Sequence, residues 1–210
     1  MKIKFKKYWR KTSLKKNDDA QFFLNHIIQK KPRSFLEVGV FHGVTSRNVC
    51  ELLFKIHGSN FTFTGIDLFE NSKKKLQQEI APHTKFANPL KHIYYKYIIR
   101  LDPYTEKSVL KLLRKFKSNI NLIKGDSNQI LKKIKDKKFD YIFLDGGHKY
   151  ETVKSDLENL IFSINNKGVI LCDDYNLTYA PGIKKAIDEF VLKNNFQLKV
   201  YQSRFAEITA

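Results

Sequence analysis

A chain of 210 residues, 42% apolar and 13% aromatic, is long and apolar enough to build one domain with a hydrophobic core, which argues against a disordered protein. Its two cysteines, Cys50 and Cys172, are too few for a disulfide framework or a cysteine-based zinc site, and both are expected to be reduced core residues. No apolar run approaches the roughly 20 residues of a transmembrane helix. No apolar segment follows the first lysines, so no signal peptide is predicted and a cytoplasmic location is expected.

The net charge of +18 comes from 39 lysines and arginines against 21 acidic residues, which leaves a nucleic-acid or anionic-membrane partner open. Most of the excess is lysine spread through several segments, and this favours solvated lysine faces over a binding surface. The one dense cluster, Lys2–Lys16, is interleaved with Phe5, Tyr8 and Trp9. Two placements of this cluster stay open: on a phosphate surface, or with one aromatic edge packed onto the domain. We expect a loosely docked helix or tail, so that residues 1–30 comprise a basic N-terminal arm and a helix. Because no motif residue lies in the arm, it is expected to be dispensable for ligand binding.

Helical and strand patterns alternate along the chain, which predicts an α/β domain with a mostly parallel sheet. In chain order, the patterns predict a helix over 18–29, a strand over 35–40, a helix over 46–56, a strand over 61–68, a helix near 105–117, strands over 119–125, 139–144 and 167–171, and a helix over 182–192. The last two strand patterns, 197–202 and 205–208, predict an antiparallel pair at the sheet edge. The whole chain, 1–210, is therefore expected to be a single domain.

The longest interval between predicted strands separates Asp67 from Asn119, and residues 70–118 form an insertion within it. Insertions of this length in a compact domain are usually functional or disordered, and the aromatic content of this one argues against disorder. Two interpretations stay open: a lid over a ligand pocket, or a subunit contact in a homo-oligomer.

The first predicted strand ends in a turn that contains glycine. Glu37 interrupts its apolar run, Gly39 and Gly43 follow, and Thr45 and Ser46 open the next helical pattern. Glycine lets a backbone approach a ligand closely, and a helix start offers free N–H groups. A carboxylate before the first glycine suits a ligand that carries an ammonium or a hydroxyl group. The pattern predicts a ligand site here, with an ordinary tight turn as the alternative.

The second predicted strand ends at Asp67, and a carboxylate at this spacing can accept hydrogen bonds from both hydroxyls of a ribose. A helix cap is the alternative, since Asn71 and Ser72 follow closely. Phe41 occupies the middle glycine position of the dinucleotide fingerprint G-x-G-x-x-G, which disfavours a pyrophosphate ligand. The adjacent His42 is expected to line the pocket.

The third predicted strand ends in Gly125-Asp126-Ser127. The carboxyl ends of parallel strands form the edge where ligands bind in open α/β sheets, so Asp126 and Ser127 are candidate ligand residues. Either side chain could equally cap the following helix.

The most specific motif is the run Phe139–Leu157, which contains D-G-G-H-x-Y-E-x-V-x-x-D-L. Together with E-x-G-x-x-x-G in the first turn, with Gly168–Tyr175 and with Pro181–Phe190, it resembles the class I S-adenosylmethionine-dependent methyltransferases. Within that class, the motifs resemble a small bacterial group related to macrocin-type sugar O-methyltransferases and, more distantly, to catechol O-methyltransferases. The resemblance covers residues 33–192 and implies a Rossmann-like, doubly wound sheet with helices on both faces.

The resemblance also implies a binding site for S-adenosylmethionine. Transferred by position, this cofactor site comprises Glu37, Gly39, Gly43, Thr45, Ser46, Asp67, Asp126, Ser127 and Asp145. In the resembled enzymes an acid at the place of Asp126 commonly approaches the adenine amino group.

Three carboxylates follow two neighbouring predicted strands: Asp145 ends the fourth, and Asp173 and Asp174 end the fifth. Such a cluster is costly unless a cation neutralises it or a proton is shared, and oxygen ligands suit Mg²⁺ or another hard divalent ion. In the resembled enzymes, acids at these positions bind a divalent metal that orients the acceptor hydroxyls. A helix-capping or turn-capping role is the alternative.

His148 follows Asp145 by three residues, the place of a catalytic lysine in the catechol enzymes. A histidine can accept a proton near neutral pH, so His148 is the candidate base beside Asp145. The neighbouring Lys149 and a purely structural histidine remain alternatives.

The predicted activity is metal-assisted methyl transfer from S-adenosylmethionine to a hydroxyl oxygen. A sugar or glycan precursor is the favoured acceptor, and a small polyol or phenol is the next candidate. Two other classes stay open. One is a basic nucleic-acid-binding or RNA-modifying protein, and the other is an inactive scaffold with a methyltransferase-like fold.

Overall fold

A computed structural model describes residues 3–69 and 88–209 of the chain. Its helices are α1 (Asn17–Lys30), α2 (Val44–His57), α3 (Pro89–Ile93), the π-helical turn η2 (Tyr94–Ile99), α4 (Glu106–Leu113), the 3-10 turn η3 (Arg114–Phe116), α5 (Ser127–Lys133), α6 (Tyr150–Leu160) and α7 (Gly182–Asn194). Its strands are β1 (Ser34–Val38), β2 (Thr62–Asp67), β3 (Ile120–Lys124), β4 (Phe139–Leu144), β5 (Ile164–Cys172), β6 (Gln197–Tyr201) and β7 (Phe205–Thr209).

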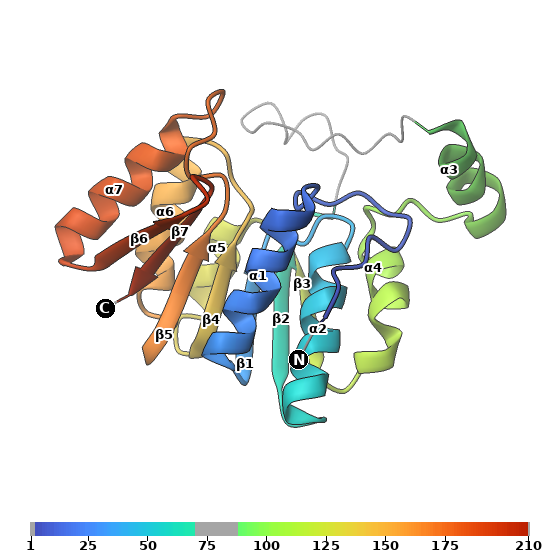
Figure 1. Cartoon of the computed structure of the whole chain (residues 1–210), viewed down its shortest axis with the longest axis horizontal. Helices are drawn as coiled ribbons and strands as arrows, with labels where there is room; N and C mark the ends of the chain where they lie inside the picture. The colour runs from blue at the N-terminus through green and yellow to red at the C-terminus, as the bar shows by residue number, and fades with distance from the viewer. Residues whose placement is uncertain (1–2, 70–87, 210) are drawn as a thin grey trace.

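The seven strands form one sheet in the order β3-β2-β1-β4-β5-β7-β6, shown in Figure 1. The first five strands run parallel, and β7 runs antiparallel between β5 and β6. The order reverses direction at β1, which lies between β2 and β4, so the sheet is doubly wound. The predicted mostly parallel sheet with an antiparallel C-terminal strand is confirmed.

Alternating side chains of the central strands feed two separate hydrophobic layers, as expected for strands buried on both faces. Phe35 stacks on Phe63 at 5.8 Å and on Tyr141 at 4.9 Å, between ring centroids, on the face covered by α1 and α2. Leu36 and Ile142 point to the other face and pack with residues of α5, α6 and α7. This burial on both faces holds the strand ends, and the residues that follow them, in fixed positions.

The N-terminal arm, residues 3–16, is an extended segment that is firmly packed, which differs from the loosely docked arm expected from the sequence. Ile3 and Leu14 are buried in the same layer as Phe35. The backbone of Lys6 and the side chain of Asn48 on α2 exchange two hydrogen bonds, at 2.9 and 2.8 Å. Apolar side chains at both ends of the arm and a polar anchor on α2 therefore fasten it to the domain.

The predicted insertion is described in its second half, while residues 70–87 lie outside the described residues. The expected helix near 105–117 is present as α4 and η3. Val109 and Leu113 of α4 pack with Val40 and Phe69, which follow β1 and β2. In the described ranges, no helix combines the length and the apolar character needed to cross a bilayer.

Candidate functional site

The residues singled out by the sequence motifs gather at the edge of the sheet where the parallel strands end. Glu37 lies in β1, Asp67 ends β2, Asp145 directly follows β4 and Asp173 directly follows β5. Since these strands are parallel neighbours, their carboxyl ends meet at one edge, which is the ligand-binding edge of open α/β sheets.

The glycine turn after β1 brings the backbones of two strands into direct contact. Gly39 has a φ of +95°, and a Cβ placed on it would lie 2.2 Å from the carbonyl oxygen of Asp145. Gly43 has a φ of +72°, and a Cβ there would lie 2.7 Å from Cγ1 of Val109. Only glycine fits either position, so the turn is built for close approach between β1, β4 and α4.

Glu37 is fully buried, with 0% of its surface exposed. Ser46, in the first turn of α2, donates a hydrogen bond to its Oε2, whereas Oε1 has no hydrogen-bond partner among the described residues. Burial raises the pKa of Glu37 to about 8, with the negative charge of Asp67 adding to the effect and the bond from Ser46 opposing it. A buried carboxyl oxygen that lacks a donor is costly in an unliganded protein and suits a ligand that brings one. Thr45 is buried in the same helical turn.

Asp67, at the candidate site, also stabilises the glycine turn through hydrogen bonds. Its carboxylate accepts hydrogen bonds from the backbone N–H groups of Phe41 at 2.7 Å and Phe69 at 2.9 Å. Phe41 has a φ of +52°, a conformation that a bulky residue rarely adopts, and the bond to Asp67 stabilises it. A third bond comes from the hydroxyl of Tyr104 at 3.0 Å. Tyr104 was not identified from the sequence.

Asp126 and Ser127 both have local structural partners. Asp126 is the N-cap of α5 and accepts a hydrogen bond from the backbone N–H of Asn128 at 3.0 Å. Ser127 donates to Asp156 at 3.0 Å. The capping alternative raised by the sequence is therefore present, and contact with an adenine ring stays a prediction.

The three carboxylates predicted to form a metal site lie together. Asp145, Asp173 and Asp174 each offer an oxygen atom within 4.8 Å of the others. An unpredicted residue, Arg204 in the turn between β6 and β7, donates to both oxygens of Asp173 at 2.6 Å. The same guanidinium bonds Asp19 at 3.0 Å and lies 3.7 Å from Asp174.

A single guanidinium does not balance this cluster. Burial, followed by the negative charges of Asp173 and Asp174, raises the pKa of Asp145 well above its ordinary value. Burial likewise raises the pKa of Asp173, although the hydrogen bond from Arg204 opposes the shift. Clustered oxygen ligands with excess negative charge fit a hard divalent cation, so Asp145, Asp173 and Asp174 satisfy the chemistry of the predicted metal site.

His148 lies beside the acidic cluster on the loop that follows β4. Its Nε2 is 3.5 Å from Oδ2 of Asp174, and its side chain is half-buried. His148, which follows β4, is thus close to the cluster because it contacts Asp174, which follows the neighbouring strand β5. The role of His148 in proton transfer stays a prediction.

The N-terminal arm crosses the same edge of the sheet. It runs along α2 to the start of α4 and then back to α1 (Figure 1). Arg10 is buried and donates to the carbonyl oxygen of His42 and to the carbonyl oxygen of Ser108, both at 3.0 Å. Three residues later, Ser13 donates to Oδ2 of Asp145 at 2.7 Å. The arm therefore forms one wall of the candidate site, and sequence motifs gave no sign of it.

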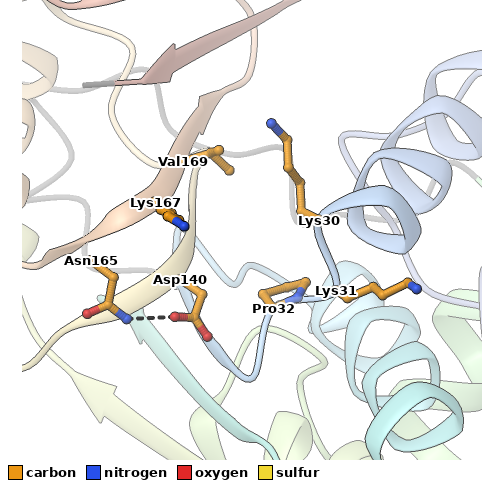
Figure 2. Close-up of a pocket in the computed structure, with 7 residues that line it drawn as sticks. All are labelled: Lys30, Lys31, Pro32, Asp140, Asn165, Lys167 and Val169. Carbon is orange, nitrogen blue, oxygen red and sulfur yellow. Dashed lines mark hydrogen bonds between the residues drawn. The ribbon is translucent and has the colours of Figure 1, made fainter.

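A cavity of about 210 Å³ lies at the opposite edge of the sheet, where β1, β4 and β5 begin. Figure 2 shows its lining, with Asp140 turned towards Asn165, whose side chain donates to it at 2.6 Å. The backbone N–H groups of Arg33 and Ser34 also donate to Asp140. Its carboxylate is therefore already occupied in joining β1 to β4 and β5.

Comparison with known proteins agrees with the geometry. The sequence matches the methyltransferase-domain family over residues 36–175. A search of curated proteins found no match. Among solved structures, the S-adenosylhomocysteine-bound methyltransferase PaMTH1 of Podospora anserina is 15% identical with a TM-score of 0.61, and the match covers 93% of this chain and 79% of that one.

Two O-methyltransferase structures are similar to the same extent. NovP is 19% identical with a TM-score of 0.61, and the match covers 89% of this chain and 75% of that one. CalS11, a TDP-rhamnose 3'-O-methyltransferase, is 13% identical with a TM-score of 0.60, covering 90% of this chain and 77% of that one. These likenesses confirm the fold, and the family match covers more than half of the sequence. The chain belongs to the methyltransferase-domain family.

Proposed function

We propose that this protein transfers the methyl group of S-adenosylmethionine to a hydroxyl oxygen of a small acceptor. The observation that carries the proposal is the pair of carboxyl groups at the ends of β1 and β2, Glu37 and Asp67, on either side of a glycine turn. The ammonium of the donor supplies the hydrogen-bond donor that Oε1 of Glu37 lacks. The ribose hydroxyls of the donor bind Asp67.

The transfer itself is an in-line displacement. A lone pair of the acceptor oxygen forms a bond to the methyl carbon while the carbon–sulfur bond breaks, and its electron pair stays on sulfur to give S-adenosylhomocysteine. The hydroxyl proton passes to a base. The main contribution of the protein is to hold the oxygen and the methyl group at reacting distance and in line. The firm burial of both sheet faces provides the rigid frame that this positioning requires.

The acceptor side of the site is assigned to the acidic cluster and to His148. Asp145, Asp173 and Asp174 would hold a divalent ion, which, when bound, lowers the pKa of an acceptor hydroxyl and orients it. His148, 3.5 Å from Asp174, is placed to take the hydroxyl proton. Ser13 holds one oxygen of Asp145 and so helps to fix the direction of that carboxylate.

A sugar or glycan precursor is the first candidate acceptor. Neighbouring sugar hydroxyls are oxygen ligands that a hard divalent ion accepts, and the structural neighbour CalS11 acts on a sugar. A polyol or a phenol would satisfy the same chemistry. A nucleic-acid-binding protein without transferase activity, one of the two other classes left open by the sequence, has no comparable support.

The test is methyl transfer from labelled S-adenosylmethionine to a panel of nucleotide sugars, polyols and phenols, with and without EDTA. Product should form with one acceptor class, disappear in EDTA and return with Mg²⁺ or Mn²⁺. The His148→Ala variant should lose turnover while it still binds S-adenosylhomocysteine and Mn²⁺. Full turnover in EDTA would remove the metal from the proposal, and unchanged turnover of His148→Ala would remove the base.

A further inference from the structure

The helical segment α3–η2, residues 89–99, exposes an apolar stripe to solvent. Leu90 is 68% exposed, Ile93 49%, Tyr97 59% and Ile98 68%. Spacings of three and four residues place Leu90, Ile93 and Tyr97 along one side of a helix, and Ile98 directly follows Tyr97. Figure 1 shows α3 beyond α4 and away from the sheet, so this stripe does not contribute to the core of the domain.

The segment is nonetheless tied to the body of the protein through the N-terminal arm. Tyr95 is buried, and the guanidinium of Arg10 lies 5.9 Å from the centre of its ring. Trp9 meets the ring of Tyr94 edge-on at 5.8 Å, and Trp9 itself is 59% exposed. Trp9 is therefore an exposed aromatic residue beside this helical segment, and we call Trp9 and the four residues of the stripe the α3 surface.

The charged side chains within the two segments that contribute to the α3 surface all have one sign. Residues 3–16 contain seven lysines and arginines, residues 88–100 contain three, and neither range contains an aspartate or a glutamate. Lys96 lies within the helical segment, before Tyr97, and Arg100 directly follows the end of the segment. A helix with apolar and aromatic residues on one side and cations around them has the composition of segments that lie in a membrane interface.

We propose that the α3 surface binds the surface of an anionic lipid bilayer. A second copy of the chain is a poorer occupant, because face-to-face contact would bring the two sets of cations together without acids to balance them. RNA is also a poorer occupant. Leu90, Ile93 and Ile98 are aliphatic and cannot stack on bases in the way that single-stranded nucleic acid requires. An anionic bilayer matches both the apolar side chains and the cations, since acyl chains would bury the former and phosphate headgroups would pair with the latter.

The experiment is sedimentation of the full chain with phosphatidylcholine vesicles that contain phosphatidylglycerol, compared with vesicles of phosphatidylcholine alone. The protein should pellet with the anionic vesicles and release in high salt. The double variant Leu90→Ser, Ile98→Ser should reduce partitioning about tenfold or more. The double variant Lys96→Gln, Arg100→Gln should reduce it about fivefold for each charge removed.

Matched controls are available elsewhere on the surface. Leu192 on α7 is 84% exposed, so Leu192→Ser removes a leucine that is more exposed than Leu90. Lys132→Gln with Lys133→Gln on α5 removes two charges. Neither control should change partitioning. The proposal is overturned if anionic vesicles do not bind, or if the Leu90 and Ile98 double variant pellets like the wild type. It is also overturned if single-stranded RNA binds in place of vesicles, or if the α3 surface instead forms a dimer that this variant dissociates. None of these readouts needs methyl transfer, so the outcome is independent of the proposed activity.

Discussion

The hydroxyl of Tyr104 donates a hydrogen bond to Oδ1 of Asp67 at 3.0 Å, in the place where the proposed donor would present its ribose. In the proposed complex, the phenol and a ribose hydroxyl would therefore compete for the same carboxylate oxygen. When the donor binds, a hydrogen bond from the ribose would replace the one from Tyr104. The Tyr104 hydroxyl should therefore have little effect on the affinity for the donor, whereas the Asp67 carboxylate should be needed for it.

Substitutions at these two positions should separate the two roles. Asp67→Ala is expected to weaken S-adenosylhomocysteine binding by about 1.5–3 kcal/mol, through loss of hydrogen bonds to a charged group. Tyr104→Phe should leave that affinity unchanged or raise it, with a loss of about 1 kcal/mol in unfolding free energy. Isothermal titration calorimetry and urea unfolding measure the two quantities. Equal losses of affinity in both variants would mean that Tyr104 contacts the donor directly.

The burial of Arg10 reverses the expectation that the N-terminal arm is dispensable. Its guanidinium donates to the carbonyl oxygens of His42 and Ser108, and Arg10→Met would remove one hydrogen bond from each of them. We expect a loss of about 1–3 kcal/mol in unfolding free energy and weaker donor binding. Lys4→Met, at an exposed position of the same arm, is the matched control and should change neither. Donor affinity that survives deletion of residues 1–16 would restore the original expectation.

The strands and their ends could be predicted from local sequence patterns. The ends of β2, β4 and β5 could be predicted from apolar runs that stop at Asp67, Asp145 and Asp173, and the end of β1 from Gly39, because strand length and glycine turns depend on neighbouring residues. The parallel sheet then follows from the alternation of strands and helices, and it brings these ends together.

The residues that complete the site could not be predicted in this way. Ser13 reaches Asp145 across 132 positions of sequence, and Arg204 reaches Asp173 across 31. Arg10 and Tyr104 likewise act through contacts that only tertiary packing creates. The arm also lacks helical periodicity, so its charge suggested a solvated tail, while its anchoring depends on single buried side chains such as Leu14.

The pKa of Glu37, raised by burial to about 8 from 4.5, predicts a pH dependence of stability. Between these two values the folded protein keeps a proton that the unfolded chain has lost, so stability falls as the pH rises through the window and is constant above it. Glu37→Gln has no carboxyl group to titrate here, so its free energy of unfolding lacks this fall with pH. The advantage of the variant over the wild type should therefore grow with pH, by at most about 5 kcal/mol across the window. Urea unfolding at about pH 5 and about pH 9 tests this, and a constant difference between variant and wild type would contradict it.

Asp173 and Asp174 should respond differently to the same substitution. Asp173→Asn breaks the buried pair with Arg204 and should cost about 3–5 kcal/mol of unfolding free energy. Asp174 is half-buried and has a φ of +60°, a conformation that asparagine tolerates, so Asp174→Asn should fold with little loss. Its affinity for Mn²⁺ should nevertheless drop. Titration of the folded Asp174→Asn variant with Mn²⁺ makes the comparison, and wild-type affinity would exclude Asp174 as a ligand.

The proposed function depends above all on which ligand binds to Glu37, the glycine turn and Asp67. Isothermal titration calorimetry of the full chain with S-adenosylhomocysteine, and separately with NADH, tests it most directly. We predict micromolar binding of S-adenosylhomocysteine, on the order of −8 kcal/mol, and no binding of NADH, because Phe41 replaces the glycine that a pyrophosphate needs. Binding of NADH without binding of S-adenosylhomocysteine would contradict the account.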